Sequence, residues 1–190
     1  MADPGFVSID QLRDVESLNL YRELEPKLGA KAALHRVLAG TRDAARTPMQ
    51  WDAGPGAGFT EGNPWIGLAV DYADGWNAEQ QDQDSDSVLN CYRLLLALRR
   101  AHRVFSYGSF RLLYEGRRDL FCYLRSGKGE RFAVVLNLSD KAVPAPRMPR
   151  SADCVYDSSG APAPRMQPYE AQIWRLPSRY GKREKREEKA

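Results

Sequence analysis

The sequence predicts an α+β protein in which helices come first and an antiparallel β module follows. Three observations lead to this prediction. Apolar residues recur with helical spacing on both sides of a long irregular stretch. That stretch, residues 41–76, sustains neither the helical nor the strand period and is punctuated by glycine and proline. After His102, short runs rich in aromatic and β-branched residues alternate with turn signals, which indicates strands.

Three helices are expected. The first covers about residues 14–25 and should end or kink at Pro26. The second covers about residues 31–38. The third and strongest covers about residues 87–102, and its broad apolar stripe is suited to packing against other elements. This stripe comprises Val88, Leu89, Tyr92, Leu95, Leu96 and Leu98.

Residues 41–76 are predicted to form a long ordered loop. A structureless connection of this length in a compact domain is usually either functional or disordered. Three of the four tryptophans, Trp51, Trp65 and Trp76, lie in this stretch, which argues against disorder. Two roles remain open for them. Either they stack on sugar faces, or they serve as hydrophobic anchors of the loop, which is the commoner role.

The C-terminal part, residues 104–177, is expected to form a small antiparallel β-sandwich. Gly127 and Gly129 predict a hairpin between two of its strands. The charged tail, residues 178–190, is expected to be disordered. The predicted strands are residues 109–114, 120–124, 131–138, 155–156 and 171–176.

The charge and cysteine content narrow the class of protein. The net charge of +3 comes from the tail, where six Lys and Arg outnumber three Glu, so no basic face for nucleic acid is expected. No apolar run is long enough to cross a membrane, and no membrane partner is expected. Three cysteines at wide spacing fit neither a disulfide framework nor a zinc pair, so we expect reduced thiols in a cytoplasmic protein.

The best candidates for chemistry are Arg42 and Arg46 at the start of the loop. A guanidinium is a planar fork of donors that can hold a carboxylate or adjacent sugar hydroxyls. The structural alternative is a salt-bridge network with Asp43 and Asp52 that fixes the loop. This alternative is the commoner outcome for such a cluster.

No cofactor or metal is expected. His35 and His102 are isolated and have no metal-ligand partner at a suitable spacing. The sequence contains neither a glycine-rich phosphate loop nor a serine in a nucleophile elbow. Carboxylates in the loop cannot be assigned catalytic roles from spacing alone, because glycoside hydrolysis needs two carboxyl groups at a fixed separation across a pocket.

The motif RDAARTPMQWD at residues 42–52 resembles the oligo-1,6-glucosidase branch of the α-amylase superfamily. This branch includes α-1,4- and α-1,6-glucosidases, trehalose-6-phosphate hydrolases and sucrose isomerases. The resemblance covers about residues 8–177. Further similar segments are RDVESLN at 13–19, AGFT at 57–60, PWI at 64–66, DSVLN at 86–90, LRRAH at 98–102, LNLS at 136–139 and PYEA at 168–171.

The resemblance implies a (β/α)8 barrel followed by a C-terminal β-sandwich. A barrel alone takes at least roughly 200 residues, whereas this chain offers about 100 before the predicted sandwich. The chain therefore resembles the last part of the family's chain. Residues 1–103 would be the C-terminal portion of the catalytic barrel with the active-site loop 41–76, and residues 104–177 the sandwich domain.

The family's chemistry is retaining glycoside hydrolysis by an Asp nucleophile, a Glu acid/base and a second Asp. No residue of this chain matches any of these three roles, so we expect no catalytic residue here and no activity from the chain alone. Arg42 resembles the family's glucose-binding arginine. The implied function is the C-terminal part of an exo-acting retaining α-glucosidase acting on α-1,6 or α-1,4 bonds of short oligosaccharides.

Two partners follow from this resemblance: an α-glucosidic oligosaccharide, and the barrel portion that precedes this region in the family. The alternative function is a non-catalytic protein of the same fold, either an interaction module or a carbohydrate-binding remnant.

Overall fold

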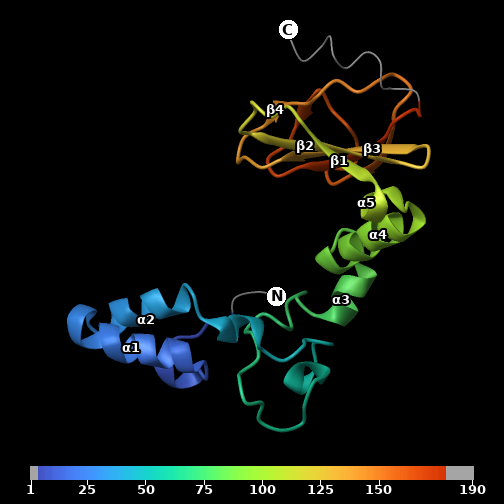
Figure 1. The fold of residues 1–190 in the computed structure, drawn as a ribbon. Helices are drawn as coiled ribbons and strands as arrows, with labels where there is room; N and C mark the ends of the chain where they lie inside the picture. The colour runs from blue at the N-terminus through green and yellow to red at the C-terminus, as the bar shows by residue number, and fades with distance from the viewer. Residues whose placement is uncertain (1–3, 179–190) are drawn as a thin grey trace. The chain divides into compact units, whose positions relative to one another are not determined.

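The structure is a computed structural model that describes residues 4–178, so the predicted charged tail lies outside the described residues except for Ser178. The chain divides into two compact units, one mainly helical and one formed mainly by strands (Figure 1). The boundary falls between Leu95 and Leu96. The sequence places the boundary eight residues later, after residue 103. Within residues 4–178, the helices are all too short or too polar to cross a membrane.

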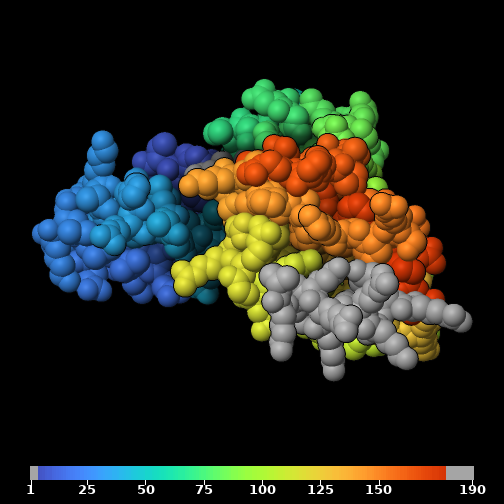
Figure 2. Space-filling view, turned by 90° about the horizontal axis from the view of Figure 1, so that it is seen from above, coloured from blue at the N-terminus to red at the C-terminus, as the bar shows by residue number. Residues whose placement is uncertain are grey.

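The first unit is helical and irregular, and two of its helices lie side by side (α1 and α2, blue in Figures 1 and 2). They pack around a small core in which Phe6, Leu12 and Val37 meet Ile66 of the loop. The elements of this unit are η1 (Ile9–Gln11), α1 (Val15–Leu28), α2 (Ala30–Leu38), η2 (Arg42–Ala45), η3 (Pro55–Gly58), α3 (Ala78–Gln83) and the start of α4 (Val88–Ala101).

Helix α1 begins as expected and ends later than expected. Asp14 caps it, because its side chain accepts a hydrogen bond from the Ser17 amide. The predicted range of about 14–25 ends three residues too early, since the helix continues through Pro26 to Leu28, and the alternative of a kink at Pro26 stays a prediction. A proline in the last turn removes only one backbone hydrogen bond, and the chain direction changes instead at Gly29, whose φ of 79° favours glycine.

Backbone hydrogen bonds hold the loop of residues 41–76. The Trp51 amide donates to the Ala57 carbonyl at 2.8 Å, so the segment between them folds back on itself. The amides of Ala78 and Glu79, at the start of α3, donate to the carbonyls of Gln50 and Trp51, each at 2.9 Å. The loop contains only the short 3-10 turns η2 and η3 as regular structure, in agreement with the lack of a sustained period.

The second unit is a two-layer antiparallel β structure, as predicted. Its larger sheet has five strands in the order β1-β2-β3-β7-β5, and its smaller sheet pairs β4 with β6. Leu120, Cys122 and Val135 of the larger sheet pack against Val143 and Met166 of the smaller one. The strands are β1 (Ser109–Leu113), β2 (Leu120–Gly127), β3 (Glu130–Asn137), β4 (Val143–Pro144), β5 (Asp153–Asp157), β6 (Arg165–Met166) and β7 (Ala171–Arg175).

The predicted hairpin between β2 and β3 is confirmed. Gly127 pairs with Glu130, and the two residues between them, Lys128 and Gly129, have φ angles of 48° and 82°. Positive φ at both central residues is the geometry of a tight two-residue hairpin turn, which explains the glycine.

A short helix, α5 (Val104–Tyr107), precedes the sheet and was not expected from the sequence. The Arg125 guanidinium fastens it to β2 by donating to the carbonyls of Val104 and Phe105 at 3.3 and 3.1 Å. The His102 ring packs on Phe132, with 4.7 Å between the ring centroids.

Candidate functional site

The turn η2, which carries Arg42, is tied to the start of α1 by a buried carboxylate. The side chain of Asp43 is fully buried. Its Oδ2 atom accepts hydrogen bonds from the amides of Arg13 at 2.6 Å and Asp14 at 2.8 Å. Two segments 29 residues apart in the sequence, each containing an Arg-Asp dipeptide, are therefore held together through backbone atoms.

Arg42 forms ion pairs with two acidic residues at the start of α1. Its Nε and Nη2 atoms lie 3.1 and 2.8 Å from Asp14 Oδ1. Its Nη2 atom also lies 3.1 Å from Glu16 Oε2. The Arg42 side chain remains 58% exposed, so the guanidinium is oriented by its partners and still reachable from solvent.

Arg46 pairs with both buried carboxylates, Asp14 and Asp43. Its Nη1 atom lies 3.2 Å from Asp14 Oδ1 and 3.3 Å from Asp43 Oδ1. The structural alternative is therefore right for Asp43, which pairs with Arg46. It is wrong for Asp52, whose Oδ1 accepts the Gly54 amide at 2.8 Å within the loop.

The environment of Asp14 favours its ionised form. Burial alone would raise the pKa of this carboxyl group. The hydrogen bonds from the Ser17 hydroxyl and amide, together with the Arg42 guanidinium, outweigh burial and lower the pKa below its usual value. Asp14 is therefore a stable anionic partner for Arg42 at neutral pH.

Arg42 lines an open depression of about 540 Å³ along one face of α1. The other lining residues mix carboxylates with apolar and amide groups: Val15, Glu16, Asn19, Leu20 and Glu23. Polar groups on an apolar floor suit a small hydroxylated ligand.

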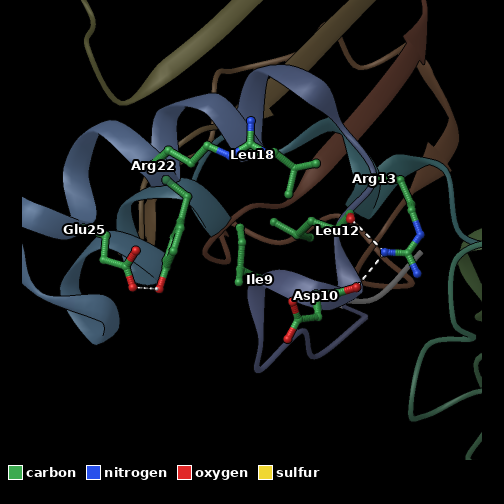
Figure 3. Close-up of a pocket in the computed structure, with 8 residues that line it drawn as sticks. Ile9, Asp10, Leu12, Arg13, Leu18, Arg22 and Glu25 are labelled. Carbon is green, nitrogen blue, oxygen red and sulfur yellow. Dashed lines mark hydrogen bonds between the residues drawn. The ribbon is translucent and has the colours of Figure 1, made fainter.

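A second depression, of about 390 Å³, lies on the opposite face of α1 and does not include Arg42 (Figure 3). There the Arg13 Nη1 atom donates to the carbonyls of Asp10 and Leu12, at 2.6 and 2.9 Å. The Tyr21 hydroxyl donates to Glu25 at 3.0 Å. These polar groups are bonded to one another, so this face adds nothing to the predicted site.

The three loop tryptophans are not the anchors of the loop. Trp51, Trp65 and Trp76 are 53%, 60% and 47% exposed. The buried apolar residues of the loop instead include Ala57, Ile66 and Ala69. The anchoring interpretation is therefore wrong, and the stacking of tryptophan on sugar faces stays a prediction.

The sequence motif points to Arg42, but its partners Asp14 and Glu16 were not predicted. The available signal was the position of Asp14 at the start of the predicted helix 14–25, since an aspartate there can cap the helix and meet neighbouring charges. Within residues 4–178, no group of three or more His, Cys, Asp or Glu side chains is arranged to hold a metal ion.

Two protein families match this chain. The family described as "Alpha amylase, catalytic domain" matches residues 21–108, and "Domain of unknown function (DUF3459)" matches residues 115–174. Among curated relatives, a trehalose-6-phosphate hydrolase of Escherichia coli (strain K12) is 41% identical over 145 residues, which are 76% of this chain and 26% of that protein. An oligo-1,6-glucosidase of Bacillus cereus is 37% identical over 141 residues, or 73% of this chain and 25% of that protein.

Solved structures give the same result. A Bacillus licheniformis trehalose-6-phosphate hydrolase superimposes with a TM-score of 0.81 and 32% identity, covering 93% of this chain and 34% of that chain. An isomaltulose synthase from Klebsiella sp. LX3 superimposes with a TM-score of 0.80 and 28% identity, covering 92% of this chain and 33% of that chain. This chain therefore spans about a quarter of the curated relatives and a third of the solved structures.

The catalytic-domain match, the domain that follows it and the fold together define a member of the α-amylase superfamily. Within it, the chain belongs with the oligo-1,6-glucosidases and trehalose-6-phosphate hydrolases, and it covers the C-terminal part of their length. The predicted resemblance is confirmed, and so is the predicted fold class of a helical barrel remnant followed by a β-rich domain.

Proposed function

We propose that this chain forms the C-terminal part of an exo-acting retaining α-glucosidase that hydrolyses α-1,6 or α-1,4 bonds of short oligosaccharides. Arg42 binds the terminal glucosyl unit. The observation that carries the proposal is the motif of residues 42–52, which the structure folds into a turn that presents an oriented, solvent-accessible guanidinium. The relatives named oligo-1,6-glucosidase and trehalose-6-phosphate hydrolase support the substrate class.

The role proposed for Arg42 is binding. A planar guanidinium donates in parallel to two neighbouring acceptors, which suits a pair of adjacent sugar hydroxyls. Glu16 is 80% exposed in this ion pair, and an exposed pair contributes little to stability. A sugar hydroxyl can therefore replace Glu16 on Nη2 at small cost. The nucleophile and the acid/base would come from residues outside this chain, so the chain alone is inactive.

The second proposed partner is the barrel portion that precedes this region in the relatives. Helix α4 lies within the match to the catalytic domain and contains no buried residue. Val88, Tyr92 and Leu96, spaced at four-residue intervals along one face, are each more than half exposed. A contiguous apolar helix face of this kind commonly marks an interaction surface. We propose that this face packs on the remaining barrel elements.

A chimaera tests the catalytic proposal. The part of the E. coli trehalose-6-phosphate hydrolase that precedes its matched region would be joined to residues 8–177 of this chain. Hydrolysis of isomaltose, maltose, trehalose 6-phosphate and an aryl α-glucoside would be measured. We expect turnover by the chimaera and none by the 190-residue chain alone. Turnover by the chain alone would contradict the assignment of catalysis to residues outside it.

Arg42→Ala in the chimaera tests the binding role. Loss of a charged hydrogen-bonding group should lower kcat/KM by about 10- to 100-fold, which corresponds to roughly 1.5–3 kcal/mol. The matched control is Arg22→Ala on α1, because Arg22 pairs locally with Asn19 at 3.2 Å and does not line the depression of Arg42. Equal effects of the two substitutions would refute a specific role for Arg42.

The half-exposed tryptophans favour one second candidate, a non-catalytic carbohydrate-binding protein of the same fold. Aromatic side chains that are exposed on a fixed loop can stack on sugar faces. Titration of the 190-residue chain with isomaltose, followed by the indole signals of Trp51 and Trp65, tests this candidate. Saturable shifts without turnover by the chimaera would favour the binding protein over the enzyme.

We also propose a cytoplasmic location. Cys122 and Cys154 are free thiols in the structure, and free thiols persist in reducing compartments. Thiol labelling of the protein in intact and fractionated cells would test the location, and an extracellular pool of the chain would contradict it.

A further inference from the structure

Asp14 is the point where the hydrogen bonds of the site converge. Its Oδ1 atom faces both arginines, with Arg42 Nη2 at 2.8 Å and Arg46 Nη1 at 3.2 Å. Its Oδ2 atom accepts from the amide of Ser17 at 3.2 Å and from its hydroxyl at 3.0 Å. One carboxylate therefore caps a helix with one oxygen and orients the candidate sugar-binding arginine with the other.

We propose that Asp14 is a positioning residue that sets the orientation of Arg42 toward the sugar, separately from its role as the cap of α1. This inference rests on the proposed function of Arg42. It adds a residue that is 28 positions away in the sequence, within the similar segment 13–19, and to which the resemblance described above assigns no function.

The carboxylate of Asp14 is held firmly enough to orient another group. Its side chain is only 5% exposed. Its own amide is fixed by Asp43, the buried residue that follows Arg42 in the chain. The Ser17 hydroxyl, which bonds to Asp14, also lies 2.9 Å from the Thr41 hydroxyl, directly before Arg42. These hydrogen bonds join the start of α1 to the turn that carries Arg42.

This arrangement leaves a defined part of the guanidinium available. Asp14 occupies the edge of Arg42 formed by Nε and Nη2. Of the residues that the structure describes, none accepts a hydrogen bond from Nη1 of Arg42. Because a guanidinium is planar, fixing one edge fixes the direction of the remaining donors. The Nη1 atom, together with the Nη2 donor that the exposed Glu16 can release, is the part that we expect to meet the sugar hydroxyls.

Asp14→Asn separates the two roles of the residue. Asparagine caps a helix about as well as aspartate, so α1 should remain capped. The amide carries no charge and holds the two arginines less strongly. We therefore expect Asp14→Asn to melt at a higher temperature than Asp14→Ala, while Arg42 loses its fixed orientation. Asp14→Ala removes both roles, and its stability shows how much the cap contributes.

The experiment uses the full 190-residue chain labelled with 15N. Hydrogen exchange at Nε of Arg42, assigned by the loss of its signal in Arg42→Lys, reports orientation without any sugar. Titration with isomaltose reports binding. In Asp14→Asn we expect exchange to accelerate and isomaltose affinity to fall, each by about tenfold, the effect of one charged hydrogen bond. The control is Asp82→Asn, whose exposed carboxylate pairs with Arg93 and lies outside the depression that Arg42 lines.

The outcomes separate the inference from the proposed function. Wild-type exchange and wild-type affinity in Asp14→Asn would overturn the positioning role. Accelerated exchange with unchanged affinity would overturn it as well, because the orientation would then have no consequence for binding. Absence of isomaltose binding by both the wild-type chain and the chimaera would overturn the function proposed for Arg42. The exchange rate at Arg42 Nε would still show whether Asp14 orients Arg42.

Discussion

Replacement of Asp43 by alanine should destabilise the first unit by about 3–5 kcal/mol, the usual effect of removing one partner of a buried ion pair. The fully buried carboxylate accepts the amides of Arg13 and Asp14, at 2.6 and 2.8 Å, and lies 3.3 Å from Arg46. Alanine would leave two backbone amides without their acceptor and Arg46 without its inner partner. The link between η2 and α1 would then be lost.

Asp43→Asn should cost less, about 1–3 kcal/mol. Its side-chain oxygen can still accept the two amides that Oδ2 accepts in the wild-type protein. Its amide nitrogen would face Arg46, so a donor would meet a donor where an ion pair now lies. The expected order of stability is therefore wild type, Asp43→Asn, then Asp43→Ala.

Guanidinium unfolding followed by tryptophan fluorescence measures these differences. In a Trp174→Phe background, the remaining tryptophans all lie in the first unit, so the signal reports that unit. The matched control is Asp74→Ala, an exposed carboxylate of the same unit, for which a change within about 0.5 kcal/mol is expected. If Asp43→Ala were no more destabilising than Asp74→Ala, the reasoning that the buried carboxylate ties η2 to α1 would be refuted.

Two further predictions concern the second unit. Gly108→Ala would place a Cβ atom 2.5 Å from the Val104 carbonyl oxygen and 2.9 Å from the Ser126 carbonyl oxygen, so we expect destabilisation of about 1–3 kcal/mol in thermal melts. The control is Gly116→Ala, where a Cβ atom would meet open space and the protein should unfold like the wild type. Burial raises the pKa of the Cys122 thiol from 9.0 to about 12, so the native thiol should resist a disulfide reagent at pH 8. Because the folded-state pKa is the higher one, the stability contributed by the neutral thiol should be complete below pH 9 and fall as the pH rises toward 12. The measurement is the unfolding midpoint of the wild type and of Cys122→Ala between pH 8 and pH 12. Equal pH dependence of the two proteins would contradict a stabilising role of the neutral thiol.

Local signals predicted most of the regular structure. Helical spacing located α1, α2 and α4, and the glycines at 127 and 129 located the hairpin between β2 and β3. The short helices α3 and α5 were missed, because elements of four to six residues contain too few turns to show a period. The two-residue strands β4 and β6 likewise have no pattern of their own and exist through pairing with each other.

The site was predictable only in part. The motif singled out Arg42, but the pairing of this residue with Asp14 joins positions 28 residues apart. Such a pairing depends on how α1 and η2 are brought together, and that is determined by the buried Asp43 and by the core around Ile66. The spacing of residues in the sequence predicts neither the contacts of Asp43 nor the packing around Ile66.

The role of the tryptophans shows why the anchoring interpretation failed. Large aromatic residues in an ordered loop are normally expected to supply its burial. In this loop, hydrogen bonds fix the backbone instead. The carboxylate of Asp52 accepts the Gly54 amide, and the Trp51 amide donates to the Ala57 carbonyl. A Cβ atom at Gly58 would lie 2.3 Å from Asp52, so glycine is required for this close packing. Because hydrogen bonds and glycines already fix the backbone, the indole rings are not needed in the core and remain accessible for contact with a ligand or with the rest of a barrel.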